Sequence, residues 1–333
     1  MTPINNCIKN KDTKIKPIWL MRQAGRYLPE FREIRKSNQD FIKLCLNEKL
    51  SSEITLQPIK RFGFDAAIIF SDILMVPYGL GQQVTFEKNF GPKLGDLNLK
   101  QIENTSEEIF TKKLEPIYHL ISNTSKNELL KRRDLIGFVG APWTILIYMI
   151  NKMSPKKKLS DDFFKDDYLI SNLINLITKF LKIHIKNQIK AGAKIIQIFD
   201  SWAGLVDQNL DKYIYNPTSD IVEYVKNLGV PVICFPRCIK DYKIYCEIVK
   251  PDMVNIDYNV DPKKIIKEIK IPIQGGLDPN VLLTDKENLK KHAEKYLNIF
   301  KDHPYVFNLG HGILPETKIE LVEELISIVR NYK

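Results

Sequence analysis

The chain has 333 residues, of which 44% are hydrophobic and 27% are charged, and its formal net charge is +10. This composition is typical of a folded globular protein and excludes a disordered or fibrous chain. The positive charge is compatible with a nucleic-acid surface, an anionic membrane surface or an acidic small substrate. Because the lysines are scattered along the chain, we favour a solvated lysine-rich surface and expect no nucleic-acid or membrane partner.

The cysteines and the start of the chain indicate the compartment. Five cysteines are present at irregular spacing without a Cys-x-x-Cys pair, which is typical of free thiols in a reducing compartment such as the cytoplasm. The first residues contain no apolar core of a secretory signal, and we expect residues 1–14 to form a mobile segment. The apolar stretch from Leu135 to Ile150 is short and is interrupted by glycine and proline, so we expect a buried strand rather than a membrane span.

Short apolar runs alternate with longer amphipathic stretches along the chain. Eight of the runs predict buried strands, namely Pro17–Met21, Asp65–Ser71, Asp134–Gly140, Ile195–Asp200, Pro231–Phe235, Met253–Ile256, Ile271–Gly275 and Tyr305–Leu309. Apolar residues three or four apart predict helices between them, most clearly over 170–181, 221–228 and 319–329. Alternating strands and helices indicate a parallel sheet, and eight strands favour a single-domain (β/α)8 TIM barrel over residues 1–333. No strand is followed by Gly-x-Gly-x-x-Gly, which argues against a dinucleotide-binding fold.

Two arginines follow the first predicted strand. The stretch from Trp19 to Glu30 contains Arg22 and Arg26, with Gly25 directly before the second arginine. Gly25 and Pro29 argue against a regular helix, so we expect a strand end that opens into a loop. Guanidinium groups bind carboxylates through paired hydrogen bonds and keep their charge, so this loop predicts a site for an acidic ligand. Two arginines on a capped helix turn at the surface remain the alternative.

Four more polar residues follow predicted strands. In a barrel, the residues after the strands line one face, where the chemistry takes place. Asp72 and Ser201 come at strand ends, although either could cap a helix. Tyr148 could be a core residue, whereas His311 lies between two glycines that leave it little to pack against. Together with Arg22 and Arg26, these residues predict a cofactor-free and metal-free site in which arginines hold a polyanion and one carboxylate faces a cationic or N–H-rich part of it.

The motifs in this order resemble the uroporphyrinogen decarboxylase family. The resemblance rests on five segments that span nearly the whole chain, namely Trp19–Glu30, Phe70–Leu74, Gly137–Met149, Phe199–Gly204 and Asn308–Ile313. It departs from the family pattern at residues 151–153 and at Cys238, Tyr258 and Gly276, where we expect changes of loop shape. None of these departures falls on the proposed acid–base groups.

The resemblance implies a (β/α)8 barrel, usually a homodimer. It also implies cofactor-free and metal-free removal of carbon dioxide from the four acetate side chains of uroporphyrinogen III, which gives coproporphyrinogen III. The residues implied to bind the substrate are Arg22, Gln23, Ala24, Gly25, Arg26, Asp72, Tyr148, Ser201 and His311. Asp72, which would accept hydrogen bonds from the pyrrole N–H groups, and Arg22 are implied to be catalytic. The proton donor remains open between Arg22, His311 and water.

Two other functions have requirements that can be compared with the sequence. Corrinoid or thiol methyltransferases share this barrel, but they need a zinc site of His and Cys ligands, and no such spacing occurs among the five histidines and five cysteines. A basic nucleic-acid-binding protein would show salt-sensitive DNA or RNA binding.

Overall fold

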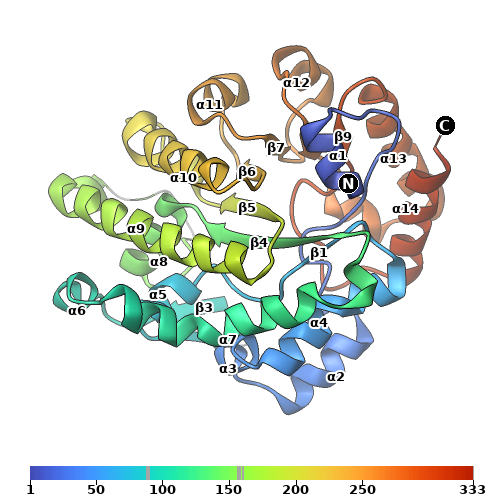
Figure 1. Ribbon diagram of the computed structural model, residues 1–333. Helices are drawn as coiled ribbons and strands as arrows, with labels where there is room; N and C mark the ends of the chain where they lie inside the picture. The colour runs from blue at the N-terminus through green and yellow to red at the C-terminus, as the bar shows by residue number, and fades with distance from the viewer. Residues whose placement is uncertain (88–90, 156–158, 160, 333) are drawn as a thin grey trace.

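A curved parallel sheet of seven strands forms the centre of the computed structural model, which describes residues 1–87, 91–155, 159 and 161–332 (Figure 1). The strand order in the sheet is β1-β4-β5-β6-β7-β8-β9, so the strands follow one another along the sheet in chain order, with β2 and β3 left out as a separate pair. The strands are β1 (Ala66–Ile68), β4 (Asp134–Gly140), β5 (Ile195–Asp200), β6 (Val232–Pro236), β7 (Met253–Ile256), β8 (Ile273–Gly275) and β9 (Tyr305–Val306). The predicted α/β class and parallel sheet are confirmed, and seven of the eight predicted strands are present.

The eighth predicted strand, Pro17–Met21, is wrong as a strand. Within the described chain it contributes a single parallel bridge, between Ile18 and Phe307. Pro17 has no N–H to donate, and the Ile18 N–H donates to the carboxylate of Asp65 at 2.7 Å instead of to a neighbouring strand. The segment still lies beside both edges of the sheet, because Phe307 N donates to Pro17 O and Asp65 N donates to Ile18 O, at 2.7 and 3.0 Å.

Helices lie around the sheet and bury their apolar residues against it or against one another. They are α1 (Pro3–Lys9), α2 (Pro29–Ser37), α3 (Phe41–Cys45), α4 (Glu48–Phe62), α5 (Met75–Gly79), α6 (Leu99–Glu103), α7 (Glu107–Ser125), α8 (Pro142–Asn151), α9 (Asp167–Ala191), α10 (Asn216–Asn227), α11 (Tyr242–Val249), α12 (Pro262–Glu268), α13 (Lys286–Ile299) and α14 (Ile319–Asn331). Figure 1 shows α7 and α9 beside β4 and β5, whereas α13 and α14 lie at the other end of the sheet near both chain termini. A separate antiparallel pair, β2 (Val84–Glu87) and β3 (Gly91–Leu94), lies outside the main sheet.

The N-terminal segment contains a helix. Ile4, Cys7 and Ile8 of α1 are buried, and the Asn5 side chain donates a hydrogen bond of 2.6 Å to the buried carboxylate of Asp134 at the start of β4. The mobility expected for residues 1–14 stays a prediction. None of the helices in the described part of the chain has the length and apolar character that crossing a bilayer requires.

A buried polar network lies inside the sheet. Trp19 Nε1 donates to Gln274 Oε1 at 2.8 Å, and Gln274 Nε2 donates to Asn255 Oδ1 at 2.9 Å and to Gln197 Oε1 at 3.2 Å. All four side chains are fully buried. Since β5, β7, β8 and the 17–21 segment each contribute one member, the network ties distant parts of the sheet together.

Candidate active site

The loop after Met21 has the irregular backbone that its glycine and proline predict. Arg22 has a φ of +61°, a left-handed conformation that is rare for residues other than glycine. The turn is held by Gln23 N, which donates to Leu20 O at 3.0 Å, and by the Tyr27 hydroxyl, which donates to Gln23 O at 2.8 Å. The predicted loop is confirmed, and α2 begins only at Pro29.

The position of Arg22 is fixed by the loop that follows β9. Met21 N donates to Asn308 Oδ1 at 3.0 Å, and Ile313 N donates to Met21 O at 2.9 Å, so the loops after β9 and before α2 are fastened together. Gly312 lies directly against the Arg22 stem, where a Cβ atom would clash with Arg22 Cδ. Arg22 is exposed by its accessible surface, although the protein on either side of it still removes part of its solvent. Burial lowers the Arg22 pKa, while the charge of Asp72 raises it.

Asp72 is both a local cap and a site residue. Its Oδ1 accepts a hydrogen bond of 2.8 Å from Leu74 N, which fixes the turn before α5. Its Oδ2 accepts no hydrogen bond from the described residues. Burial raises the Asp72 pKa from 3.8 to about 6, although the Leu74 N–H and the positive charge of Arg22 lower it. The carboxylate therefore presents one free oxygen and is held in a poorly solvated place.

His311 accepts a backbone hydrogen bond and lies near two positively charged side chains. Its Nδ1 accepts from Gly312 N at 2.7 Å, so in the neutral ring the proton is on Nε2. Burial, followed by the positive charges of Arg237 and Arg22, lowers the His311 pKa from 6.5 to about 4. These surroundings disfavour the protonated form of His311, which is the form that could deliver a proton. His311 Nε2 has no acceptor among the described residues and can donate to an anion.

Tyr148 and Ser201 lie on neighbouring segments after β4 and β5. The Tyr148 ring on α8 meets Trp202 edge to face at a centroid distance of 6.0 Å. Its hydroxyl is 3.4 Å from Ser154 Oγ, which is long for a hydrogen bond. The Ser201 hydroxyl has no partner in the described chain, so it does not cap a helix. Burial raises the Tyr148 pKa, while hydrogen bonding to the side chains of Ser154 and Trp202 lowers it, so this hydroxyl already has protein contacts. Of the two hydroxyl groups, that of Ser201 is therefore the one available to a ligand.

The backbone around Ser201 is held by a buried carboxyl group. Thr144 Oγ1 donates to Asp200 Oδ1 at 2.6 Å and accepts from Trp202 N at 3.1 Å. Burial raises the Asp200 pKa to about 7, against the opposing effect of the Thr144 hydrogen bond. This arrangement fixes the start of the segment after β5.

The other residues of the arginine loop have different surroundings. The Gln23 side chain is fully buried, where Nε2 donates to Ala66 O at 3.0 Å and Oε1 accepts from Leu20 N at 3.1 Å. These bonds give Gln23 a structural task, and its contact with substrate stays a prediction. Ala24 and Gly25 are partly exposed, and their N–H groups donate no hydrogen bond within the described structure. Arg26 is exposed, and its charge contributes to lowering the Arg22 pKa.

Electrostatic interactions connect residues that are far apart in the sequence. Asp72 and Tyr148 both raise the Arg22 pKa, and Arg22 in turn lowers the His311 pKa. The structure thus brings Arg22, Arg26, Asp72, Tyr148 and His311 into one region. The guanidinium groups of Arg22 and Arg26 donate to no acceptor among the described residues. The arrangement can hold several carboxylates around a single free carboxylate oxygen.

Three residues were missed from the sequence. Phe138 of β4 and Phe199 of β5 are the partly exposed members of otherwise buried strands, and their rings meet edge to face at 5.7 Å. They offer an apolar surface near the carboxyl ends of the strands, and a phenylalanine this close to a strand end was the available signal. Arg237 directly follows β6, so the strand-end rule could have found it.

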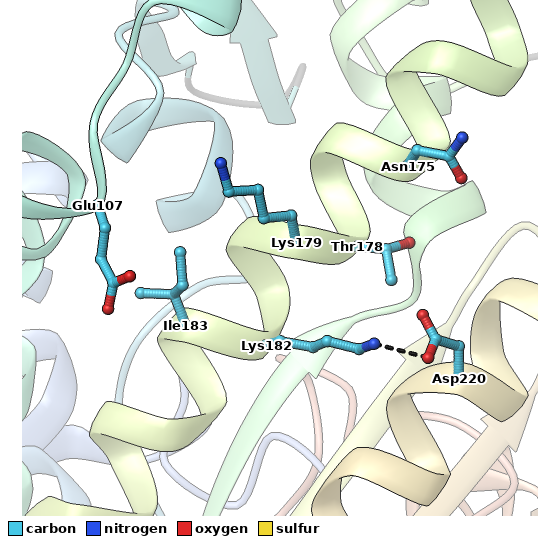
Figure 2. A pocket seen from close by; sticks show the side chains of 7 residues that line it. All are labelled: Glu107, Asn175, Thr178, Lys179, Lys182, Ile183 and Asp220. Atoms are coloured by element: carbon cyan, nitrogen blue, oxygen red, sulfur yellow. Dashed lines mark hydrogen bonds and ion pairs between the residues drawn. The ribbon is translucent and has the colours of Figure 1, made fainter.

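The cavity between α7, α9 and α10 does not suggest a second active site. A cavity of about 370 Å³ lies between α7, α9 and α10 and contains none of the predicted site residues (Figure 2). Its Lys182 and Asp220 already form an ion pair of 2.6 Å. Within residues 1–87, 91–155, 159 and 161–332, no group of three or more His, Cys, Asp or Glu side chains could hold a metal ion.

Comparison with known proteins gives the family. The family model described as uroporphyrinogen decarboxylase (URO-D) matches residues 1–332. A uroporphyrinogen decarboxylase from Rickettsia bellii is 42% identical over 340 residues, which cover 100% of this chain and 99% of the relative. Another from Rickettsia africae is 42% identical over 341 residues, with coverage of 100% and 98%.

One solved structure supports the fold alone. A methyltransferase from Methanosarcina mazei superposes with a TM-score of 0.79, covering 98% of this chain and 97% of that chain, at 14% sequence identity. Identity this low carries no argument about the reaction. The sequence relatives and the family match do identify the chain, which belongs to the uroporphyrinogen decarboxylase family of carboxy-lyases.

Proposed function

We propose that this protein is a uroporphyrinogen decarboxylase that converts the four acetate side chains of uroporphyrinogen III to methyl groups and releases coproporphyrinogen III. One observation carries the proposal beyond family membership. Arg22, Arg26 and His311 carry hydrogen-bond donors that have no acceptor among the described residues, and the charge of Arg22 acts on the carboxylate of Asp72, whose Oδ2 is free within the described chain. A macrocycle with carboxylates outside and pyrrole N–H groups inside has the complementary pattern.

The proposed binding roles follow from these donors and acceptors. Arg22, Arg26 and His311 hold carboxylates at the periphery of the macrocycle, and Asp72 Oδ2 accepts hydrogen bonds from its N–H groups. Tyr148 and Ser201 bind side chains of the substrate or position the reacting acetate. The backbone N–H groups of Ala24 and Gly25 add donors between the two arginines, and Gln23 keeps that loop in place.

The chemistry uses the pyrrole ring as its own electron acceptor. Protonation of the ring carbon next to the acetate-bearing carbon creates an iminium-like cation. The bond to the carboxylate then breaks, its electron pair enters the ring, and carbon dioxide leaves. The resulting methylene takes up a proton to become methyl, and the ring carbon loses the proton it gained. Each cycle thus consumes one proton per acetate and needs no external oxidant or reductant, which is why we infer a reaction without cofactor or metal.

Asp72 stabilises the cation. A fixed negative charge in a poorly solvated site is worth on the order of 3–4 kcal/mol to a developing positive charge. Arg22 orients the departing acetate or relays a proton from water, because a guanidinium group is a weak acid near neutral pH. A neutral His311 is suited to binding a carboxylate rather than to delivering the proton.

We further infer the architecture and setting that the family resemblance implies. The Pro17–Met21 segment closes the sheet into one (β/α)8 barrel domain over the whole chain, supported by its hydrogen bonds to both sheet edges. The protein forms a homodimer and works in the cytoplasm, which agrees with its five free cysteines. Light scattering after size-exclusion chromatography tests the dimer.

The activity is tested by incubating the purified protein with uroporphyrinogen III under reducing conditions. Carbon dioxide and products with seven to four carboxylates are then followed over time. We expect stepwise appearance of the seven-, six- and five-carboxylate intermediates before coproporphyrinogen III. If the folded wild-type protein releases no carbon dioxide under these conditions, the proposal is refuted.

A further inference from the structure

Arg237 occupies a position at the end of β6 that its backbone defines tightly. Arg237 N donates to Asp200 O at 3.0 Å, and Gly204 N donates to Arg237 O at 3.1 Å. These bonds join Arg237 to the segment that carries Ser201. The next residue, Cys238, has a φ of +60°, so the chain turns away immediately after Arg237. The direction of the Arg237 side chain is thus set by the backbone on both sides.

The side chain of Arg237 has one partner among the residues that the structure describes. Its Nε lies 3.5 Å from Oδ2 of Asp257, which is too long for a good hydrogen bond, and Asp257 is 1% exposed. The two terminal nitrogens of Arg237 donate to no acceptor among the described residues. Asp257 therefore orients the guanidinium group but leaves its outer edge, the part that forms paired bonds with carboxylates, unused.

The charge of Arg237 is directed at the active site. Its charge lowers the pKa of Arg22 and of His311, which come from the loops before α2 and after β9. Asp72 is the negative group that acts on Arg22 in return, and Asp257 is already paired with Arg237. Three guanidinium groups and one histidine thus share a region with two carboxylates, which leaves positive charge for an anion to balance.

We propose that Arg237 is a further substrate-binding residue, which holds a carboxylate of the porphyrinogen next to those bound by Arg22 and His311. The proposal rests on the proposed function. The competing explanation is that Arg237 only balances the buried charge of Asp257. In that case its terminal nitrogens would remain in solvent when substrate binds.

The test uses the substitutions Arg237→Gln, Arg237→Lys and Asp257→Asn, with Arg132→Gln as a control. Arg132 is an exposed arginine just before β4, at the opposite end of the strands. We expect Arg237→Gln to raise KM for uroporphyrinogen about tenfold while kcat stays within about threefold of wild type. Arg237→Lys keeps the charge beside Asp257 but loses the planar fork, so we expect a severalfold rise in KM. The control should leave both constants unchanged.

The double variant Arg237→Gln/Asp257→Asn separates the two explanations. If Arg237 binds substrate, the double variant keeps the high KM, because the carboxylate still lacks its partner. If it returns to a wild-type KM, Arg237 serves only Asp257 and the proposal is overturned. Should Arg237→Gln fail to fold, a wild-type KM for Arg237→Lys overturns it equally.

A binding measurement separates this proposal from the proposed function. Fluorescence titration with the oxidised porphyrin octacarboxylate reports affinity without turnover. Absence of turnover by the wild-type protein would refute the proposed function, whereas equal porphyrin affinity of wild type and Arg237→Gln would refute the role of Arg237. We expect the substitution to weaken porphyrin binding by about the same factor as it raises KM.

Discussion

Replacing Asp72 with asparagine removes one negative charge and little volume. Asparagine can still accept the hydrogen bond that Leu74 N gives to Oδ1, so the turn before α5 should survive. Loss of the charge removes on the order of 3–4 kcal/mol of stabilisation from the protonated ring, so we expect kcat to fall by about 10²–10³. KM should stay within about threefold, because the substrate carboxylates are held by other residues.

The same substitution should stabilise the fold, and the direction of the Asp72 pKa shift determines the pH range in which it does so. The Asp72 pKa is raised from 3.8 to about 6, so between these pH values the folded protein binds more protons than the unfolded chain. Stability therefore falls as the pH rises through this window. A shift of two units corresponds to about 3 kcal/mol, and partial access of solvent reduces this to about 1–2 kcal/mol. The asparagine variant avoids this loss.

Thermal unfolding at several pH values measures the effect. The Asp72→Asn protein should match wild type near pH 4 and exceed its Tm by a few degrees above about pH 6. Asp302→Asn, which changes an exposed aspartate, is the control and should show no such pH-dependent difference. Equal Tm values at about pH 7.5 would refute the burial argument, and near-normal turnover would refute the catalytic role.

Three further predictions follow from the same geometry. In the pH profile of kcat/KM, the acid limb should lie near pH 6 and report the ionisation of Asp72. The limb should therefore persist in the His311→Asn variant, although the KM of this variant should rise. Disappearance of the limb in that variant would contradict the prediction. Gly312→Ala should reduce kcat/KM about as much as Arg22→Gln while far-UV circular dichroism stays unchanged, since the new methyl group displaces the Arg22 stem; wild-type kinetics would contradict the packing argument. Lys16→Met should lower the free energy of unfolding by about 1–3 kcal/mol without changing kcat. The reason is that Lys16 Nζ donates to the backbone carbonyl oxygens of residues 300, 301 and 303 at 2.8–3.0 Å. An unchanged denaturant midpoint would contradict this prediction.

The strand-end rule explains how much of the site was predictable. Asp72 and Ser201 come just after buried strands. Their positions could be predicted because the apolar runs that form these strands can be recognised in the sequence alone. For Asp72, the capping interpretation is confirmed by the bond from Leu74 N to Oδ1, and the functional interpretation stays a prediction that the second carboxylate oxygen leaves possible. His311 was found by the same rule, but its pKa was not predictable, since it depends on Arg237, which is distant in the sequence.

Features that depend on side-chain partners across the sheet could not be predicted from the sequence. The Pro17–Met21 run has strand composition, yet the Asp65 carboxylate takes the N–H that a neighbouring strand would need. The family resemblance implies a substrate contact for Gln23, which stays a prediction, whereas the bond that its amide gives to Ala66 O was not visible in the sequence. Such pairings depend on three-dimensional packing, which a periodicity of apolar residues does not specify.

The charges of the site also suggest how product leaves. Arg22 and Arg237 repel each other, and the burial of Asp72 disfavours its charge. Under the proposed function, the carboxylates of the substrate attract the guanidinium groups, and its ring N–H groups donate to Asp72. Each decarboxylation then removes one carboxylate from the cationic region while leaving the N–H groups on Asp72. Attraction to the arginines should therefore weaken with each acetate lost while the ring N–H groups still face Asp72, so we expect each intermediate to bind less tightly than the one before it and coproporphyrinogen III to be released most readily.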